Sequence, residues 1–197
     1  MACSGMAGPG KAPDSELLHR AALAHLGRYP STRSRLLRVL LRRIARWARA
    51  ADSAPDVIAV QVAEAQSAAR SVVASLVESG VVDDAAFAAA RARRLARSGT
   101  SRRGIAAHLM RHGLRGRELA AILAGDPEAE LAAALVFARK HHIGPFRPDA
   151  SSDAAGRRRE LAQLARAGYP AQIAEAALTM PRAEAEGRLM AARRQAE

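Results

Sequence analysis

The spacing of apolar residues along the chain predicts a wholly helical protein. Apolar positions recur every three or four residues in one segment after another, and no segment shows the sustained alternation or the β-branched clusters of a strand. The pattern is clearest in residues 31–51, where the recurring apolar side chains are Leu36, Leu37, Leu40, Leu41, Ile44 and Trp47. A helix with this spacing packs one side and exposes the other.

Capping residues and breakers divide this pattern into successive helices. A loose tail, residues 1–13, precedes Asp14 or Ser15 as the first N-cap. Pro55 begins a stretch without a breaker until Gly80, which predicts one long helix. Further helices are expected within residues 83–97, 100–113, 115–125, 126–142, 153–168 and 170–180, and residues 182–197 are expected to form a frayed, helical C-terminal tail.

Three of these segments resemble one another, which predicts an internal repeat. They are STRSRLLRVLLRR (31–43), TSRRGIAAHLMRHGL (100–114) and GRRRELAQLARAGY (156–169). When Leu40, Leu109 and Leu164 are aligned, each segment has basic residues at its start and an arginine two residues after the leucine. The sequence therefore predicts an all-α fold of three tandem three-helix repeats in an elongated, curved array, namely residues 14–80 with an extended third helix, 81–125 and 126–181.

The charge of the chain predicts an anionic partner. Of the 197 residues, 31 are Lys or Arg and 19 are Asp or Glu, which gives a net charge of +12. A protein this basic usually binds a polyanion, such as DNA, RNA, an acidic protein surface or an anionic lipid. A GC-rich genome would also favour arginine and alanine, so the arginine content alone does not identify the partner. Aromatic residues make up only 3%, which argues against a platform that stacks single-stranded bases.

Several classes of function have no residues to support them in this sequence. Cys3 is the one cysteine, so a disulfide framework or a thiolate zinc site within the chain is excluded. His108 and His112 have a spacing that metals can use, but no third ligand is evident. No Gly-rich phosphate loop, nucleophile turn, signal peptide or membrane-length apolar run is present. We therefore expect a cytoplasmic protein that has no catalytic residue, bound metal or cofactor and does not insert into a membrane.

Two adjacent aspartates begin the second predicted repeat. Asp83 and Asp84 follow the stop at Gly80 and precede a helix, where a carboxylate accepts hydrogen bonds from free backbone N–H groups. A catalytic dyad or a metal site needs carboxylates that converge on one atom, whereas neighbours at a helix start usually diverge. We therefore expect Asp83 and Asp84 to cap the helix, and Phe87 to lie in the apolar core.

The stretch GVVDDAAFA (80–88) resembles the signature Gly–aromatic or aliphatic–x–Asp–Asp–x–x–Phe–Ala of the RecX family, bacterial regulators of the RecA recombinase. The three basic segments described above resemble the same family, so the resemblance covers about residues 17–180. Its structural signature falls on Asp83, Asp84, Phe87, Gly113 and Gly168. One departure lies in the first repeat, where IARWARAADSAPDVIAVQVAEAQ replaces the Gly–aromatic stop and makes the connection longer than is usual in the family.

The resemblance implies a regulator that works by binding rather than by catalysis. Proteins of this family bind the helical filament of RecA on single-stranded DNA, lie in its groove and span neighbouring protomers. They thereby restrain filament growth, ATP turnover, strand exchange and co-protease activity. The expected partner of this chain is accordingly the RecA filament, bound by a monomer, with direct contact to single- or double-stranded DNA as an additional expectation.

The arginines are the candidate binding residues. They are Arg35, Arg38, Arg42, Arg46, Arg91, Arg94, Arg97, Arg102, Arg103, Arg111, Arg157, Arg158 and Arg166. At about 100° per residue, the first four of these project from one side of a helix. Another four, Arg94, Arg97, Arg102 and Arg103, flank a short turn with no acid nearby in sequence, so we expect an uncompensated cluster there that contacts carboxylates or phosphates of the filament.

The alternative function is direct binding of DNA or RNA by a basic helical protein. A sequence-specific reader needs one recognition helix with polar side chains that contact bases. Three equivalent basic helix starts are better suited to a long groove. A helix that lies on a membrane surface is the weakest interpretation, since no helix has an aromatic-rich apolar side.

Overall fold

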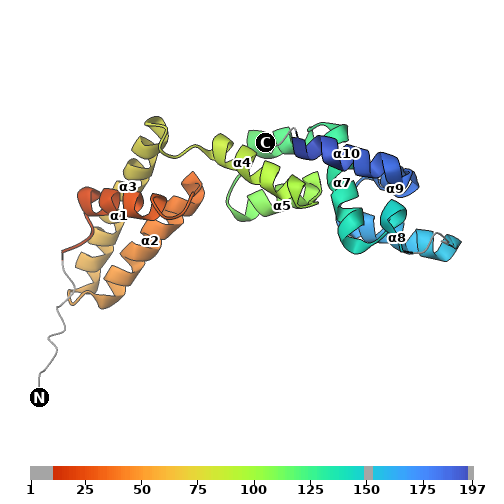
Figure 1. Cartoon of the computed structure of the whole chain (residues 1–197). Coiled ribbons are helices and arrows are strands. Elements are labelled where there is room, and N and C mark those ends of the chain that lie inside the picture. The colour runs from red at the N-terminus through yellow and green to blue at the C-terminus, as the bar shows by residue number, and fades with distance from the viewer. Residues whose placement is uncertain (1–10, 149–152, 195–197) are drawn as a thin grey trace, which may run out of the picture. The chain divides into compact units, whose positions relative to one another are not determined.

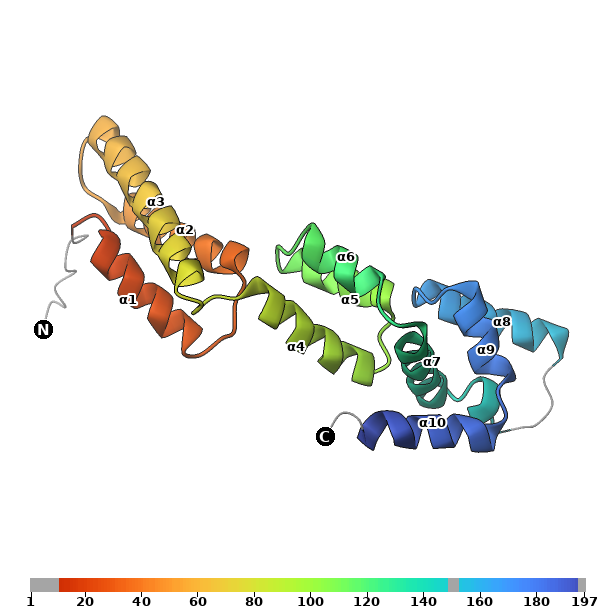
Figure 2. The same cartoon turned by 90° about the horizontal axis from the view of Figure 1, so that it is seen from above.

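The computed structural model describes residues 11–148 and 153–194, and all secondary structure in these residues is helical (Figures 1 and 2). The prediction of an all-α fold is therefore confirmed. In chain order the helices are α1 (Ser15–Leu26), α2 (Arg33–Ala50), α3 (Pro55–Glu78), α4 (Asp84–Arg97), α5 (Arg102–Arg111), α6 (Arg117–Leu123), α7 (Pro127–His141), the short 3-10 helix η1 (Gly144–Phe146), α8 (Ala154–Arg166), α9 (Ala171–Thr179) and α10 (Arg182–Arg194). They form two compact units, Met1–Phe87 and Ala88–Glu197.

Helices α1, α2 and α3 make the first unit and lie side by side (Figures 1 and 2). Leu36, Leu40 and Ile44 of α2 are fully buried at a spacing of four residues, as the apolar pattern predicts. The long helix predicted after Pro55 is present as α3, and its buried residues begin at Ala65. The core of this unit consists of Leu18, Ala22, Leu36, Leu40, Ile44, Ala65, Ala69, Val72, Val73, Leu76 and Val82.

The core of the second unit is built by its C-terminal helices. It contains Leu131, Ala133, Ala134, Leu135, Ala138, Ile143, Phe146, Leu164, Tyr169, Ala174, Ala177, Leu178, Ala185 and Leu189. The predicted C-terminal tail is helical over Arg182–Arg194, and this helix, α10, packs on α7 through Ala185 and Leu189. Helices α5 and α6 pack on each other, but no residue of α6 is buried.

The helix order agrees with three successive three-helix repeats followed by α10. In this arrangement α1–α3, α4–α6 and α7–α9 are the repeats, and each predicted boundary falls in a loop or at a helix end. We propose that residues 14–80, 81–125 and 126–181 are repeats in this sense.

Phe87 does not occupy the core position that the sequence suggests. Its side chain is partly buried and belongs to neither core cluster, so the core prediction is wrong. The buried residue of α4 is Ala88, the next residue in the chain. Because adjacent helical residues point about 100° apart, the buried side of α4 is displaced by one position from the expected one.

Gly168 fixes how α8 packs on the start of α5. Its φ is +92°, in the left-handed region, as is that of the corresponding Gly113 at +87°. A Cβ on Gly168 would lie 2.7 Å from Ser101 Oγ and 3.1 Å from Arg103 Cβ. The stop predicted at Gly168 is thus confirmed, and the residue has a second role because no side chain fits there.

We predict that Gly168→Ala lowers the free energy of unfolding by about 2–5 kcal/mol. The left-handed backbone costs an alanine about 1–2 kcal/mol, and the close approach to α5 adds about 1–3 kcal/mol of overpacking. The control is Gly80→Ala, where φ is +72° and nothing lies within 4 Å of the added Cβ. Urea denaturation should show the smaller loss, about 1–2 kcal/mol, for Gly80→Ala. Equal losses would contradict the close packing at Gly168.

Candidate partner-binding surface

The adjacent aspartates cap two different helices, α4 and α2. Asp83 Oδ1 accepts a hydrogen bond of 2.9 Å from the backbone N–H of Ala86, which is the N-cap of α4 that the sequence predicts. Asp84 Oδ1 instead accepts a bond of 2.8 Å from the N–H of Arg33, the first residue of α2. The two carboxylates therefore diverge, and each satisfies a free donor at a helix N-terminus.

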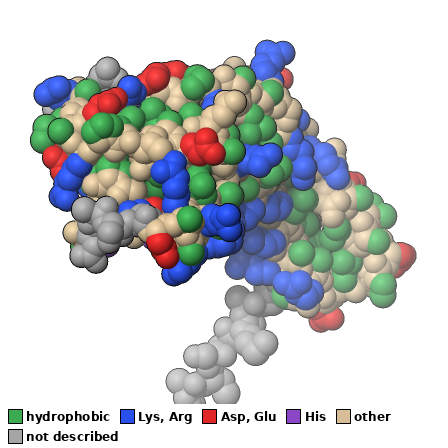
Figure 3. Space-filling view, turned by 90° about the vertical axis from the view of Figure 1, so that its right-hand side faces the viewer, with side chains coloured by type: hydrophobic (Ala, Val, Ile, Leu, Met, Phe, Trp, Pro, Cys, Tyr) green, Lys and Arg blue, Asp and Glu red, His purple; other side chains and the backbone are tan. Residues whose placement is uncertain are grey.

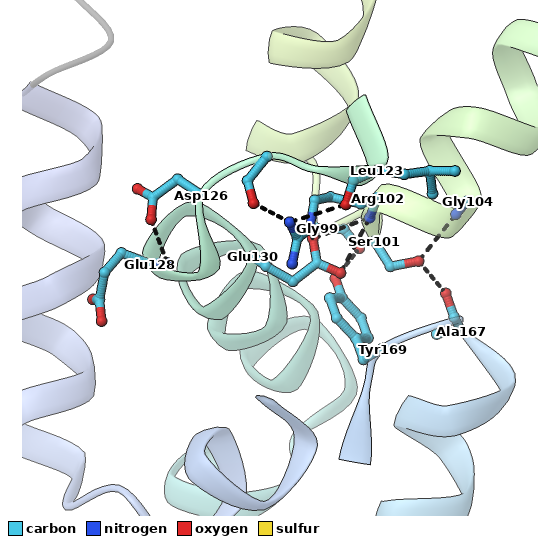
Figure 4. A network of polar contacts seen from close by, with 11 residues as sticks. Gly99, Ser101, Arg102, Gly104, Leu123, Asp126, Glu128, Glu130, Ala167 and Tyr169 are labelled. Atoms are coloured by element: carbon cyan, nitrogen blue, oxygen red, sulfur yellow. Dashed lines mark hydrogen bonds and ion pairs between the residues drawn. The ribbon is translucent and has the colours of Figure 1, made fainter. Parts of the chain in front are cut away.

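Glu130 caps the N-terminus of α5 in the same way that Asp84 caps that of α2. Its carboxylate accepts hydrogen bonds of 3.2 and 3.0 Å from the N–H of Arg102, the first residue of α5 (Figure 4). In both cases an acidic residue near the start of one helix, α4 or α7, caps the second helix of the preceding predicted repeat. Donor and acceptor are 51 and 28 residues apart, so no local pattern in the sequence could reveal either contact.

Arg102 is part of this buried network, which corrects a prediction made from the sequence. Its Nε lies 3.4 Å from Oε2 of Glu130, whose side chain is only 2% exposed. Its Nη1 donates to the backbone carbonyls of Leu123, at 3.2 Å, and Gly125 (Figure 4). The expected cluster of four uncompensated arginines therefore does not exist as such, because Glu130 neutralises one member from a distant part of the chain.

Two further side chains complete the contacts around the turn between α4 and α5. Ser101 Oγ accepts from the N–H of Gly104 at 3.1 Å and donates to the carbonyl of Ala167 at 2.6 Å. Tyr169 Oη donates to the carbonyl of Gly99 at 3.0 Å. Burial, followed by the negative charge of Glu130, raises the pKa of the Tyr169 phenol well above its usual value, so the hydroxyl stays a donor.

We predict that Glu130→Ala lowers the free energy of unfolding of the second unit by about 3–5 kcal/mol, because Arg102 would lose the carboxylate that pairs with it in a largely buried site. Glu175→Ala, at an exposed position of α9, serves as the control and should change stability by no more than about 0.5 kcal/mol. The measurement is denaturation followed by circular dichroism. A loss at Glu130 as small as that at Glu175 would show that the pair does not stabilise the fold.

Four arginines of α2 form an exposed basic surface along that helix. Arg38, Arg42, Arg46 and Arg49 are exposed, and we call these four the α2 arginine face. Arg35, also predicted to belong to it, is partly buried. Helix α2 contains no acidic residue, and in the described part of the chain no carboxylate lies within 4 Å of the four guanidinium groups of the face. On the side of the molecule shown in Figure 3, Lys and Arg side chains gather in groups, whereas acidic side chains are scattered.

The remaining candidate arginines fall into smaller sets on the second unit. Arg94, Arg97, Arg103 and Arg111 are exposed on α4 and α5, and Arg157, Arg158 and Arg166 are exposed on α8. Arg91 differs, since its Nε donates to Nε2 of His108 at 2.9 Å. The candidate arginines that are exposed to a partner therefore lie on α2, at the C-terminal end of α4, at both ends of α5 and on α8.

Histidines next to these arginines are held in the neutral form. Burial lowers the pKa of His108, and the charge of Arg91 lowers it further. Burial likewise lowers the pKa of His25, with additional contributions from Arg35 and Arg42. His25 Nε2 lies 2.8 Å from Ser31 Oγ at the start of the second repeat segment. Both rings favour the uncharged state because protonation would place a charge in a partly buried, positive site.

We predict that acidification from pH 7.5 to 5.5 lowers the melting temperature. Since both histidines have a lower pKa in the folded state, the unfolded chain binds more protons below pH 6.5, and stability is lost as the pH falls toward the folded pKa values. Replacing both by Gln, which keeps a hydrogen-bond acceptor, should reduce the difference between the two pH values. An unchanged pH dependence in the double variant would contradict this assignment.

Other kinds of site find no support in the described residues. Residues 11–148 and 153–194 contain no group of three or more His, Cys, Asp or Glu side chains placed to hold a metal ion. The rings of His108 and His112 are 4.7 Å apart between centroids and lack a third ligand in this region. None of the described helices is long and apolar enough to cross a membrane. Cys3 lies outside the residues that the structure describes.

The fold and the surface together define a basic, all-helical protein whose acidic side chains cap helices and whose exposed arginines are suited to an anionic partner. Comparison with known proteins gives the family. The chain is 38% identical over 161 residues to the regulatory protein RecX of Myxococcus xanthus, covering 80% of this chain and 82% of that protein. It is 35% identical over 108 residues to the regulatory protein RecX of Agrobacterium fabrum, covering 53% and 55%. The chain therefore belongs to the RecX family of regulatory proteins.

Two other comparisons give no match. No protein-family model matches the sequence. No solved structure matches the chain.

Proposed function

We propose that this protein binds the filament that the RecA recombinase forms on single-stranded DNA and restrains its ATP turnover, strand exchange and co-protease activity. The observation that carries the proposal is the 38% identity to a regulatory protein RecX over four-fifths of the chain. In this proposal the protein acts as a cytoplasmic monomer, without a cofactor and without catalysis of its own. Regulation follows from binding, because a protein bound along or at the end of the filament hinders its growth and its conformational cycle.

The exposed arginines support binding to such a target. A filament of protein on DNA presents both carboxylates and phosphates, and arginine forms bidentate bonds with either group. Each exposed contact is weak by itself, but the arginines of α2, α5 and α8 together give a large and salt-sensitive attraction. The network around Glu130 takes Arg102 out of this set, since that side chain is bound within the fold.

We predict that the purified protein slows ATP hydrolysis by RecA on single-stranded DNA at substoichiometric amounts. One bound molecule would affect several protomers if it blocks filament growth, so the rate should fall by more than the molar ratio. Steady-state phosphate release measures the effect, with an unrelated basic protein of similar size as the control. An unchanged rate at equimolar protein would contradict the proposed function.

Direct binding to nucleic acid is the second candidate function, and the net charge of +12 is the observation that favours it. A labelled oligonucleotide without RecA separates the two. If affinity for DNA or RNA alone equals that for the RecA filament, then the protein acts on nucleic acid directly. Much tighter binding to the filament would favour the regulator.

A further inference from the structure

We propose that the α2 arginine face binds an acidic, partly apolar segment of a protein partner rather than the phosphate backbone of nucleic acid. This inference deepens the proposed function and rests on it, with the protein component of the RecA filament as the source of the segment. Three observations support it: the spacing of the arginines, the apolar residues between them and the charge of the α2 arginine face, which no described carboxylate within 4 Å offsets.

The spacing of the arginines matches that of carboxylates on a helix. Arg38, Arg42 and Arg46 follow one another at intervals of four residues, so their attachment points rise by about 6 Å along the axis from one to the next. Asp or Glu residues at every fourth position of a partner helix have the same rise. A helix that lies alongside α2 could therefore pair several carboxylates with several guanidinium groups at once.

Apolar residues between the arginines favour a protein segment over DNA. A shallow hollow on α2 is lined by Val39 and Ala45 together with Arg42, Arg46 and Arg49. An aliphatic side chain of a partner could cover Val39 and Ala45, whereas a sugar–phosphate backbone has no comparable group. Among the described residues that line this hollow, none is aromatic, so a base has no aromatic ring to stack on.

No carboxylate of the described residues lies within 4 Å of the guanidinium groups of the α2 arginine face. Like charges four residues apart destabilise a helix. Elsewhere in the chain, arginines on a helix are paired at this same spacing, as Arg182 is with Glu186 at 3.0 Å and Arg188 with Glu184 at 3.2 Å on α10. The unpaired repetition on α2 lowers the stability of the free protein, and an acidic partner would remove that repulsion.

The first test is site-specific crosslinking from the exposed residue Ala45. Ala45→p-benzoylphenylalanine is irradiated with RecA assembled on poly(dT) with a non-hydrolysable ATP analogue, and the adducts are identified by mass spectrometry. We expect adducts on a RecA peptide that is rich in Asp and Glu. Adducts on the DNA, adducts on a RecA peptide without acidic residues, or no adduct in a sample that co-sediments with the filament would each overturn the inference. Failure of the parent protein to co-sediment would overturn the proposed function as well.

The second test uses charge reversal with a matched control. Arg42→Glu with Arg46→Glu should weaken filament binding at least tenfold, and the melting temperature should stay the same or rise because the repulsion is relieved. The control, Arg28→Glu with Arg70→Glu, makes the same change in net charge at exposed positions of the same unit and should alter binding by less than twofold. Equal weakening by the two pairs would show that only net charge matters and would overturn the inference.

Discussion

The first backbone N–H group of each of two helices, α2 and α5, depends on a carboxylate supplied by a helix that comes later in the chain. Asp84 bonds the N–H of Arg33, and Glu130 bonds the N–H of Arg102. A helix N-terminus that packs against its neighbours must satisfy its free donors, and a carboxylate does so while facing the positive end of the helix dipole. The start of α4 is thereby tied to α2, and the start of α7 to α5.

Glu130 and Arg102 join α7, the start of α5 and the end of α6 in one polar network. Because the carboxylate holds Arg102, the guanidinium reaches the carbonyls of Leu123 and Gly125 at the end of α6. In the turn between α4 and α5, which precedes Arg102, the carbonyl of Gly99 accepts a hydrogen bond from the hydroxyl of Tyr169. No residue of α6 is buried, and the side chain of Arg102 holds its C-terminal end through the carbonyls of Leu123 and Gly125.

The parts of the structure that depend on neighbouring residues could be predicted from the sequence. The apolar spacing placed α2 and its buried leucines, Pro55 and Gly80 bounded α3, and the acceptor role of Asp83 follows from its position before α4. The role of Asp84 could not be predicted, since its donor lies 51 residues earlier in the chain. For Phe87, a single aromatic among alanines suggested a core position, but which side of a helix is buried depends on packing and not on residue size alone.

Arg102 shows why a count of charges along the chain misidentifies a binding surface. In the sequence it resembles Arg103, its exposed neighbour, because no acid lies between residues 91 and 117. In the fold Arg102 is neutralised by Glu130, as Arg147 is by Glu160 through an Nε–Oε1 bond of 2.9 Å. An arginine that already pairs with a carboxylate of its own chain must break that pair before it can bind a partner. Within residues 11–148 and 153–194, the arginines of the α2 arginine face have no carboxylate within 4 Å, so no ion pair of this kind has to break before they bind an anionic partner.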